Sequence, residues 1–406
     1  MAKFGLLGKT LKHSFSPQIH KFFNDYEYDL IEKEQTELES FVKSGEYAGI
    51  NVTNPYKKEI IKYIDVVDEC AQKIGAVNTV VFDNGTLYGY NTDWYGMEYA
   101  LKKAGIELFG KKVLVLGSGG TSNTATFVAN HLGAREVLIV SRKGDINYQN
   151  CYLQTDTEII INTTPVGMFP NNYEAPLDLS KFEKLEGVFD AVYNPNMTML
   201  TFLANKKGVK YSNGLIMLVA QAKMASELFT NTKIDDELID KAEKCIKSQN
   251  QNIVLIGMAG VGKSTIAREL SKRLNKPLID TDQLIEQREN RKISEIFADS
   301  GEEYFRKVES QVLMEVGRQN GNIIATGGGI VEREENQFYL KQNAVVFNLV
   351  RDVEKLARKN RPLSTDLDAV KRLFLRRKDR YIEFSDFTID NNCTLQQTIE
   401  KIMEKL

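Results

Sequence analysis

Histidine is scarce in this chain of 406 residues. There are only three, His13, His20 and His131, and all lie in the first third of the sequence. Acid–base chemistry beyond that third must therefore use carboxylates, lysine or water. A histidine-rich metal site is excluded as well, because too few histidines are present to form one.

Cysteines and long apolar runs are also scarce. The four cysteines lie far apart, at Cys70, Cys151, Cys245 and Cys393, a spacing that indicates neither a disulfide framework nor a zinc knuckle. No apolar run approaches the ~20 residues that a membrane helix needs, and the first residues lack the apolar core of a signal peptide. We therefore expect a protein of the reduced, cytoplasmic compartment with no membrane partner.

An excess of charge of one sign is missing too. The 53 basic and 55 acidic residues give a net charge of -2, so the whole chain offers no electrostatic reason to bind nucleic acid. The expected partners are small-molecule substrates. The length corresponds to about two to four folding units, at roughly 100–200 residues per domain.

What the sequence does contain is a pair of strand–glycine-loop–helix units, at residues 111–133 and 251–274. Such units place backbone N–H groups and a helix N-terminus around a phosphate. The segment before the second unit has apolar residues at helical spacing and ends in a polar, aperiodic stretch at 248–252. We predict a linker there, with a separate domain on each side.

The second unit fits the pattern G-x-x-x-x-G-K-[ST] in full, from Gly257 to Ser264. A chance glycine turn is the alternative, but the preceding strand, the lysine, the serine and the following helix are all in place. Lys263 is expected to reach the β- and γ-phosphates of a nucleotide, and Ser264 is expected to bind Mg²⁺.

Charged residues and glycines follow this loop. Asp280 and Asp282 come after a short strand, where ligands bind to parallel sheets. Another strand runs into three glycines at 327–329, which allow the backbone to approach a small polar ligand closely. Arg306 lies one helical turn from Glu302, and taken alone it would simply pair with that carboxylate.

A basic run at 371–380 lies near the end of this half. Taken alone, it is most typical of a solvated helix face, and less often of a nucleic-acid-binding patch.

Together these motifs resemble shikimate kinase, from residue 252 to about residue 390. The phosphate loop, D-T-D, G-E-x-x-F-R, T-G-G-G, R-P-L and R-x-x-x-Y occur in that order. The resemblance implies that Lys263, Asp282 and the lid arginine Arg361 are catalytic and that ATP and Mg²⁺ are used. It implies ATP binding by Gly260, Gly262, Lys263, Ser264, Thr265 and Arg361, metal binding by Ser264 and Asp280, and shikimate binding by Asp282, Arg306, Gly328 and Arg377. The stretch before R-P-L is shorter than in most relatives, with only two residues between Arg358 and Arg361.

The first unit is a near match to G-x-G-x-x-G, with Ser122 in place of the third glycine. The strand after it, 136–140, ends in Ser141, Arg142 and Lys143. An NAD-binding unit would place an acidic residue there, so two cations favour the 2′-phosphate of NADP. The alternative is that they are ordinary exposed residues of a loop.

The residues before 111 predict a separate α/β subdomain, with a helix over 57–74. Ser14 and Ser16 precede a helix that starts at a proline, and capping of that helix would explain Ser16 but not Ser14. Polar residues after the strands form a cluster suited to a small polyol acid. Lys57, taken alone, would be a solvated helix residue.

These segments resemble shikimate dehydrogenase over residues 1–247, on the motifs NVTNPYK, IINTTPVGM, DAVYNP and NGLIMLVAQ. The resemblance implies that Lys57 and Asp93 are the catalytic pair. It implies shikimate binding by Ser14, Ser16, Thr53, Asn78, Tyr193 and Gln221, and NADP binding by Gly117, Ser118, Gly119, Gly120, Thr121, Ser141, Arg142, Thr163 and Gly214. The family usually has a full helix and another strand between positions 142 and 162, where this chain is short.

The expected fold is therefore α/β throughout. A substrate subdomain (1–102 and 215–247) and a Rossmann-like NADP subdomain (103–214) precede a P-loop kinase domain with a parallel sheet (253–406). The expected protein is a bifunctional enzyme that reduces 3-dehydroshikimate with NADPH and then phosphorylates shikimate with ATP. Two alternatives stay open: a dehydrogenase whose kinase-like half only binds ligand, and a regulatory protein without catalysis.

Overall fold

The computed structural model describes residues 2–11, 14–356 and 367–406. The chain divides into two compact units, Met1–Ile246 and Lys247–Leu406. Within the described ranges, no helix combines the length and the apolar character needed to cross a membrane.

The first unit begins with a mixed six-stranded sheet in the order β2-β1-β3-β5-β6-β4. Its strands are β1 (Lys3–Gly8), β2 (Glu27–Glu32), β3 (Gly49–Val52), β4 (Val66–Val67), β5 (Thr79–Asp83) and β6 (Thr86–Tyr90). The helices are α1 (Ser16–Phe23), α2 (Leu38–Val42), α3 (Glu69–Ile74) and α4 (Asp93–Lys103), with 3₁₀ turns η1 (Gln35–Glu37) and η2 (Glu59–Tyr63). Strands β1, β2 and β3 are parallel, whereas β5 is antiparallel to both β3 and β6.

The single helix predicted over 57–74 is wrong. That segment consists of η2, strand β4 and helix α3. Val66 and Val67 pair with β6, as β-branched residues favour, and the carboxylate of Asp68 caps α3 by accepting from the N–H groups of Cys70 and Ala71.

The second sheet of this unit is parallel and five-stranded, in the order β11-β10-β9-β7-β8. Its strands are β7 (Lys112–Leu116), β8 (Glu136–Val140), β9 (Ile159–Asn162), β10 (Gly187–Asp190) and β11 (Lys210–Ser212). The helices are α5 (Gly120–His131), α6 (Met199–Lys206), α7 (Gly214–Thr230) and α8 (Glu237–Asn250), with 3₁₀ turns η3 (Cys151–Leu153) and η4 (Leu179–Lys181). Only η3 lies between β8 and β9, in agreement with the shortened segment expected from the sequence.

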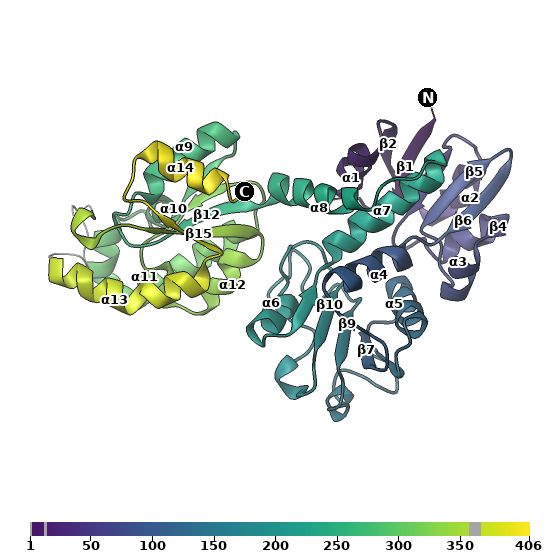
Figure 1. Ribbon diagram of the computed structural model, residues 1–406, viewed down its shortest axis with the longest axis horizontal. Coiled ribbons are helices and arrows are strands. Elements are labelled where there is room, and N and C mark those ends of the chain that lie inside the picture. Colours follow the sequence, from purple (N-terminus) through teal and green to yellow (C-terminus); the bar gives the residue numbers. More distant parts are fainter. Residues whose placement is uncertain (1, 12–13, 357–366) are drawn as a thin grey trace. The chain divides into compact units, whose positions relative to one another are not determined.

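Helix α7 returns from the second sheet to the first subdomain, as its apolar sequence predicts (Figure 1). It packs along α4, and a Cβ at Gly96 of α4 would overlap the carbonyl oxygen of Met217. Glycine is therefore required where the two helices approach most closely. This packing places Gln221 of α7 beside the first turn of α4. Gln221 and Asp93, the first residue of α4, were both predicted from the sequence as site residues.

The second unit contains one parallel sheet in the order β13-β14-β12-β15-β16. Its strands are β12 (Asn252–Ile256), β13 (Leu278–Asp280), β14 (Ile323–Ala325), β15 (Ala344–Val350) and β16 (Phe387–Asp390). The helices are α9 (Lys263–Leu274), α10 (Thr281–Glu289), α11 (Ile293–Gly317), α12 (Glu335–Lys341), α13 (Leu367–Phe384) and α14 (Leu395–Met403), with 3₁₀ turns η5 (Ile330–Glu332) and η6 (Val353–Lys355). Figure 1 shows α9 and α14 on one side of this sheet and α11 to α13 on the other.

The polar stretch 248–252, expected to be aperiodic, has regular structure. Its first residues are the end of α8, and Asn252 begins β12. The ammonium group of Lys276 donates hydrogen bonds to the carbonyl oxygens of Ser248, Gln249 and Gln251, at 3.0, 3.1 and 3.2 Å. These backbone contacts hold the connection between α8 and β12 in a defined position.

We expect each unit to fold without the other. Each unit has a hydrophobic core of its own, and the polar residues of each predicted site lie within a single unit. Two shorter chains, 1–250 and 247–406, both keep the end of α8, and the second keeps all three carbonyl acceptors of Lys276. Each should give a cooperative thermal transition followed by circular dichroism. A shorter chain without such a transition, in either case, would contradict the division into two units.

Candidate active sites

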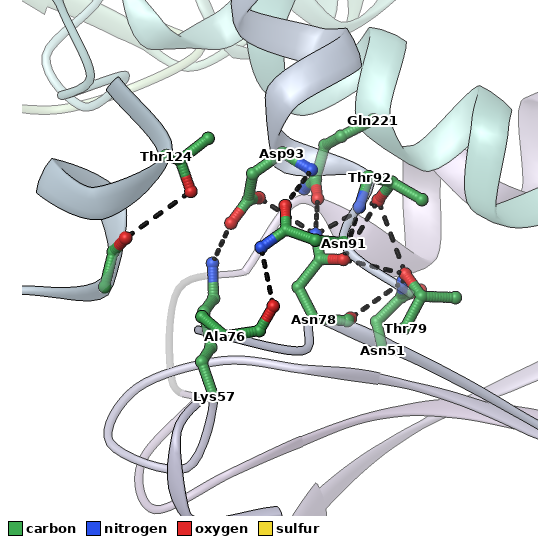
Figure 2. Close-up of polar contacts among 11 residues, drawn as sticks. Asn51, Lys57, Ala76, Asn78, Thr79, Asn91, Thr92, Asp93, Thr124 and Gln221 are labelled. Atoms are coloured by element: carbon green, nitrogen blue, oxygen red, sulfur yellow. Dashed lines mark hydrogen bonds and ion pairs between the residues drawn. The ribbon is translucent and has the colours of Figure 1, made fainter. Parts of the chain in front are cut away.

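A buried ion pair lies at the centre of the first unit. Lys57 follows β3 in the chain, and Asp93 is the first residue of α4. The Lys57 Nζ and the Asp93 Oδ2 are 2.6 Å apart, and the side chains are only 15% and 5% exposed (Figure 2). The solvated helix position considered for Lys57 is therefore wrong, and its ammonium group is held in a fixed direction by the carboxylate.

Asn78 joins this ion pair to helix α7. Its Nδ2 donates to Asp93 Oδ1 and to Gln221 Oε1, at 2.9 Å in each case. The backbone N–H of Thr92 donates to Asn78 Oδ1 at 2.7 Å, and this contact fixes which way the amide of Asn78 points. Lys57, Asn78, Asp93 and Gln221, each predicted from the sequence, thus meet in one place (Figure 2).

Supporting residues around the pair were missed as site residues. Asn91 Oδ1 accepts from the backbone N–H of Asp93 at 3.0 Å. Asn51 Nδ2 donates to Thr79 Oγ1 at 3.0 Å, and that hydroxyl lies 3.1 Å from Asn78 Oδ1. Asn51 and Thr79 are register partners on β3 and β5. The sequence contains the motifs in which these two residues lie, but it does not reveal the antiparallel register that brings Asn51 next to Thr79.

The other predicted substrate residues lie on neighbouring elements. The hydroxyl of Ser14 accepts from the N–H of Ser16 at 3.2 Å, so Ser14 rather than Ser16 satisfies the start of α1. Between them Phe15 packs against Tyr193, with ring centroids 5.6 Å apart. Thr53 follows β3 and donates its N–H to Leu7. Within the described ranges, none of these predicted substrate residues is hydrogen-bonded to Lys57 or Asp93.

The first glycine loop, residues 117–121, connects β7 to α5. Gly117 has φ 112°, and a Cβ there would lie 2.7 Å from the Thr163 hydroxyl, whereas a Cβ at Gly119 would meet nothing within 4 Å. That open space at a helix N-terminus fits a phosphate group. Ser122, in place of the third glycine, donates its hydroxyl to the carbonyl of Gly117 at 2.8 Å and so closes the loop.

This loop also adjoins the ion pair. A Cβ at Gly120 would lie 4.0 Å from the side chain of Lys57. Ser118 and Thr121 belong to the same turn. The glycine loop and Lys57, far apart in sequence, therefore face each other within the first unit.

The remaining predicted cofactor residues lie at the ends of the neighbouring strands. Ser141 follows β8 directly, and Arg142 and Lys143 after it are exposed, as a 2′-phosphate contact requires. Thr163 follows β9 and donates its hydroxyl to the carbonyl of Leu116 at 2.6 Å. A Cβ at Gly214 would overlap the carbonyl oxygen of Ala191, so this glycine permits close packing at the start of α7.

A cleft of about 820 Å³ opens in the second unit. It is lined by all the kinase-type residues predicted in the described part of the chain, except Asp280: Gly260, Gly262, Lys263, Ser264, Thr265, Asp282, Arg306, Gly328 and Arg377. Arg361 lies outside the described residues. The parallel sheet thus brings the phosphate loop, D-T-D, T-G-G-G and R-x-x-x-Y together, as the resemblance implies.

The phosphate loop lies between β12 and α9. Gly257 has φ 133°, and a Cβ there would lie 2.5 Å from the Leu349 carbonyl oxygen. The Lys263 ammonium group donates back into the loop, to the carbonyls of Gly257 and Met258, at 2.8 and 3.1 Å. The loop is therefore already folded around the lysine that is expected to meet the phosphates.

Ser264 and Asp280 form the predicted metal position. The Ser264 hydroxyl lies 2.9 Å from Asp280 Oδ2, while Asp280 Oδ1 caps α10 by accepting from the backbone N–H groups of Asp282 and Gln283. Hydroxyl and carboxylate oxygens are the hard ligands that Mg²⁺ prefers, so this pair fits the ion.

The acidic side of the cleft contains Asp282 and Glu309. Burial raises the pKa of each carboxyl above its usual value. A Cβ at Gly327 would lie within 2.7 Å of Asp282 and 2.8 Å of Glu309, and one at Gly329 would overlap the Arg306 guanidinium. The glycines at 327 and 329 were expected to admit a ligand, but they make room first for the protein's own side chains.

Both arginines of the cleft have protein partners. Arg306 pairs with Glu302 at 3.0 Å, as the sequence alternative proposed, and also with the missed residue Glu309 at 2.7 Å. Arg377 is only 3% exposed and donates to the carbonyl of Gly328 at 3.1 Å. The basic run therefore does not form a solvated face at this position, because Arg377 points inward. The i, i+3 spacing of Arg306 and Glu309 was the signal available in the sequence.

Comparisons with known proteins found a matching family model in each half of the chain. The family model "Shikimate dehydrogenase substrate binding domain" matches residues 6–80, and the model "Shikimate kinase" matches residues 259–406.

Relatives of known name cover the first half. A shikimate dehydrogenase (NADP(+)) from Caldicellulosiruptor bescii is 39% identical over 251 residues, 55% of this chain and 87% of the relative. Another from Methanococcus maripaludis is 35% identical and covers 59% of this chain and 95% of the relative.

Solved structures extend this similarity. The shikimate dehydrogenase 1 of Peptoclostridium difficile superposes with a TM-score of 0.57 at 35% identity, over 61% of this chain and 98% of that one. The Thermus thermophilus shikimate 5-dehydrogenase in complex with NADP(H) and shikimate gives a TM-score of 0.55 at 30% identity, over 60% and 99%. The chain therefore belongs to the shikimate dehydrogenase family through its N-terminal part, and its C-terminal part is a shikimate kinase domain.

Proposed function

We propose that this protein is a bifunctional enzyme of the shikimate pathway. Its first unit reduces 3-dehydroshikimate to shikimate with NADPH, and its second unit phosphorylates shikimate to shikimate 3-phosphate with ATP. The observation that supports this most directly is that one chain contains both a lysine–aspartate pair facing a glycine loop and a phosphate-loop cleft with two buried arginines.

In the first unit, NADPH supplies the hydride when it is bound. Lys57 donates a proton to the oxygen of the ketone, because the reduction of a ketone needs a proton as well as a hydride. Asp93 holds the ammonium group in a fixed direction, and Asn78 holds Asp93 in place. The substrate ring is bound by Asn78, Gln221, Ser14, Ser16, Thr53 and Tyr193.

The cofactor is bound across the ends of the second sheet. The loop 117–121 holds the pyrophosphate at the N-terminus of α5, with Thr163 and Gly214 beside it. Ser141 and Arg142 hold the 2′-phosphate, since no acidic residue occupies the position that binds a ribose diol in NAD enzymes.

In the second unit, ATP supplies the phosphoryl group when it is bound with Mg²⁺. Asp282 accepts the proton of the attacking hydroxyl, and a carboxylate whose pKa is raised by burial is a better base for this task. Arg306 and Arg377 bind the carboxylate of shikimate, which guanidinium groups recognise through paired hydrogen bonds. Lys263 offsets the charge of the phosphates, and Ser264 with Asp280 holds the metal.

Replacing Lys57 by alanine should lower dehydrogenase turnover by about 10²–10⁴-fold, the usual range for the loss of a positioned acid–base group. The KM for 3-dehydroshikimate should change less, because Asn78 and Gln221 remain. Steady-state oxidation of NADPH measures both quantities. Lys58→Ala, at the exposed neighbouring lysine, is the matched control and should leave turnover near that of the unchanged protein. Equal losses in the two variants would exclude Lys57 as the proton donor.

Replacing Lys263 by alanine should abolish shikimate-dependent ADP formation, because Lys263 offsets phosphate charge in the ground and transition states. NADPH oxidation should be unchanged, and Lys272→Ala on the exposed face of the same helix should have no effect on either activity. Mixing the Lys57→Ala and Lys263→Ala proteins should restore shikimate 3-phosphate formation, with a lag while free shikimate accumulates. Loss of both activities in one folded variant would refute two separate sites.

Cofactor preference provides an independent test of the dehydrogenase site. The unchanged protein should prefer NADPH to NADH, and Arg142→Asp should reduce the ratio of the two kcat/KM values by about tenfold or more, because a charge-assisted hydrogen bond to phosphate is lost. Equal use of the two cofactors by the unchanged protein would show that Arg142 does not recognise a 2′-phosphate.

A further inference from the structure

Arg377 is held by a carboxylate that the sequence motifs do not include. Glu332, the last residue of η5, accepts a hydrogen bond from Arg377 Nε at 2.6 Å. On another side of the guanidinium, Arg377 Nη1 donates to the carbonyl of Gly328 at 3.1 Å. Two of the three nitrogens of this side chain are thus bound by the protein itself.

The remaining nitrogen of this guanidinium, Nη2, is not bound in this way. Arg377 Nη2 is buried and has no hydrogen-bond partner within the described residues. A buried N–H group of a charged side chain without a partner is costly, so such a group is retained where a ligand acceptor can satisfy it. Arg377 lines the cleft of the second unit, where the substrate carboxylate is proposed to bind.

Glu332 does not act on Arg377 alone. It forms a second ion pair with Arg376, and its backbone carbonyl accepts from Arg380 Nη1 at 2.8 Å. Burial raises the pKa of Glu332, but the ion pairs with Arg377 and Arg376 outweigh this effect and leave its pKa below the usual value. Two cations share one carboxylate, so the cluster keeps a net positive charge that favours an anion.

We propose that Glu332 is a positioning residue for the kinase substrate: it binds the Nε of Arg377 so that Nη2 stays available to the substrate carboxylate, while Arg376 preserves the positive charge of the group. This inference rests on the proposed function, in which Arg377 binds shikimate. It adds the residue that sets the orientation of that arginine.

The test compares variants of the full chain by steady-state kinase kinetics, with shikimate and ATP each varied. Glu332→Met keeps the side-chain length but removes the strong acceptor, and it should raise the KM for shikimate by about tenfold, with kcat and the KM for ATP within about twofold of the unchanged protein. Glu332→Gln keeps an acceptor for Nε and should restore most of the affinity for shikimate. Glu335→Met is the matched control, because Glu335 pairs with Arg333 at 3.1 Å and is on the surface.

The outcomes are distinct. The inference is overturned if Glu332→Met leaves the KM for shikimate within twofold, raises the KM values for both substrates together, or is not rescued by Glu332→Gln. Arg377→Ala separates this failure from failure of the proposed site. If Arg377→Ala also leaves the KM for shikimate unchanged, Arg377 does not bind the substrate. If it raises that KM while Glu332→Met does not, only the positioning role is lost.

Discussion

Burying a charge in a protein is costly unless hydrogen-bonding groups or a partner of opposite sign lie beside it, and both sites of this chain depend on that constraint. Lys57 is paired with Asp93, Arg306 with Glu309, and Arg377 with Glu332. Removal of one member of such a pair typically costs about 3–5 kcal/mol, because the other charge is left uncompensated. The pairs therefore fix the geometry of each site before any substrate arrives.

Glycine provides the space in which these pairs lie close to the backbone. A side chain at Gly329 would occupy the position of the Arg306 guanidinium, and one at Gly327 would displace Asp282 and Glu309. In the first unit, Gly119 leaves open the space at the start of α5, and Gly117 makes room for the hydroxyl of Thr163 beside it. The same residue type thus serves two purposes, room for the protein's own charges in one site and room for a phosphate in the other.

Local motifs allowed much of this to be predicted from the sequence. The α/β class and the phosphate loop followed from patterns in which neighbouring residues act together, and the parallel topology gathers their ends at one edge of the sheet. What the sequence did not reveal depends on contacts between distant segments. Asn51 meets Thr79 only through the register of β3 and β5, and Glu332 reaches Arg377 only because η5 lies against α13. The helix predicted over 57–74 failed for a similar reason, since pairing of Val66 and Val67 with β6 overrides the local helical pattern.

Under the proposed function, the two sites would bind the same substrate carboxylate with different chemistry, and the charges of each site explain the difference. In the proposed dehydrogenase site, Lys57 and Asp93 neutralise each other, so an anionic ring acid proposed to bind Ser14 and Ser16 meets no net negative charge from this pair. The kinase cleft already contains Asp282 and Glu309 and must also accept the phosphates of ATP, all of which repel a carboxylate. Buried arginines are needed there to overcome that repulsion. Each guanidinium also needs a partner within the protein itself, and Glu302, Glu309 and Glu332 provide these partners for Arg306 and Arg377.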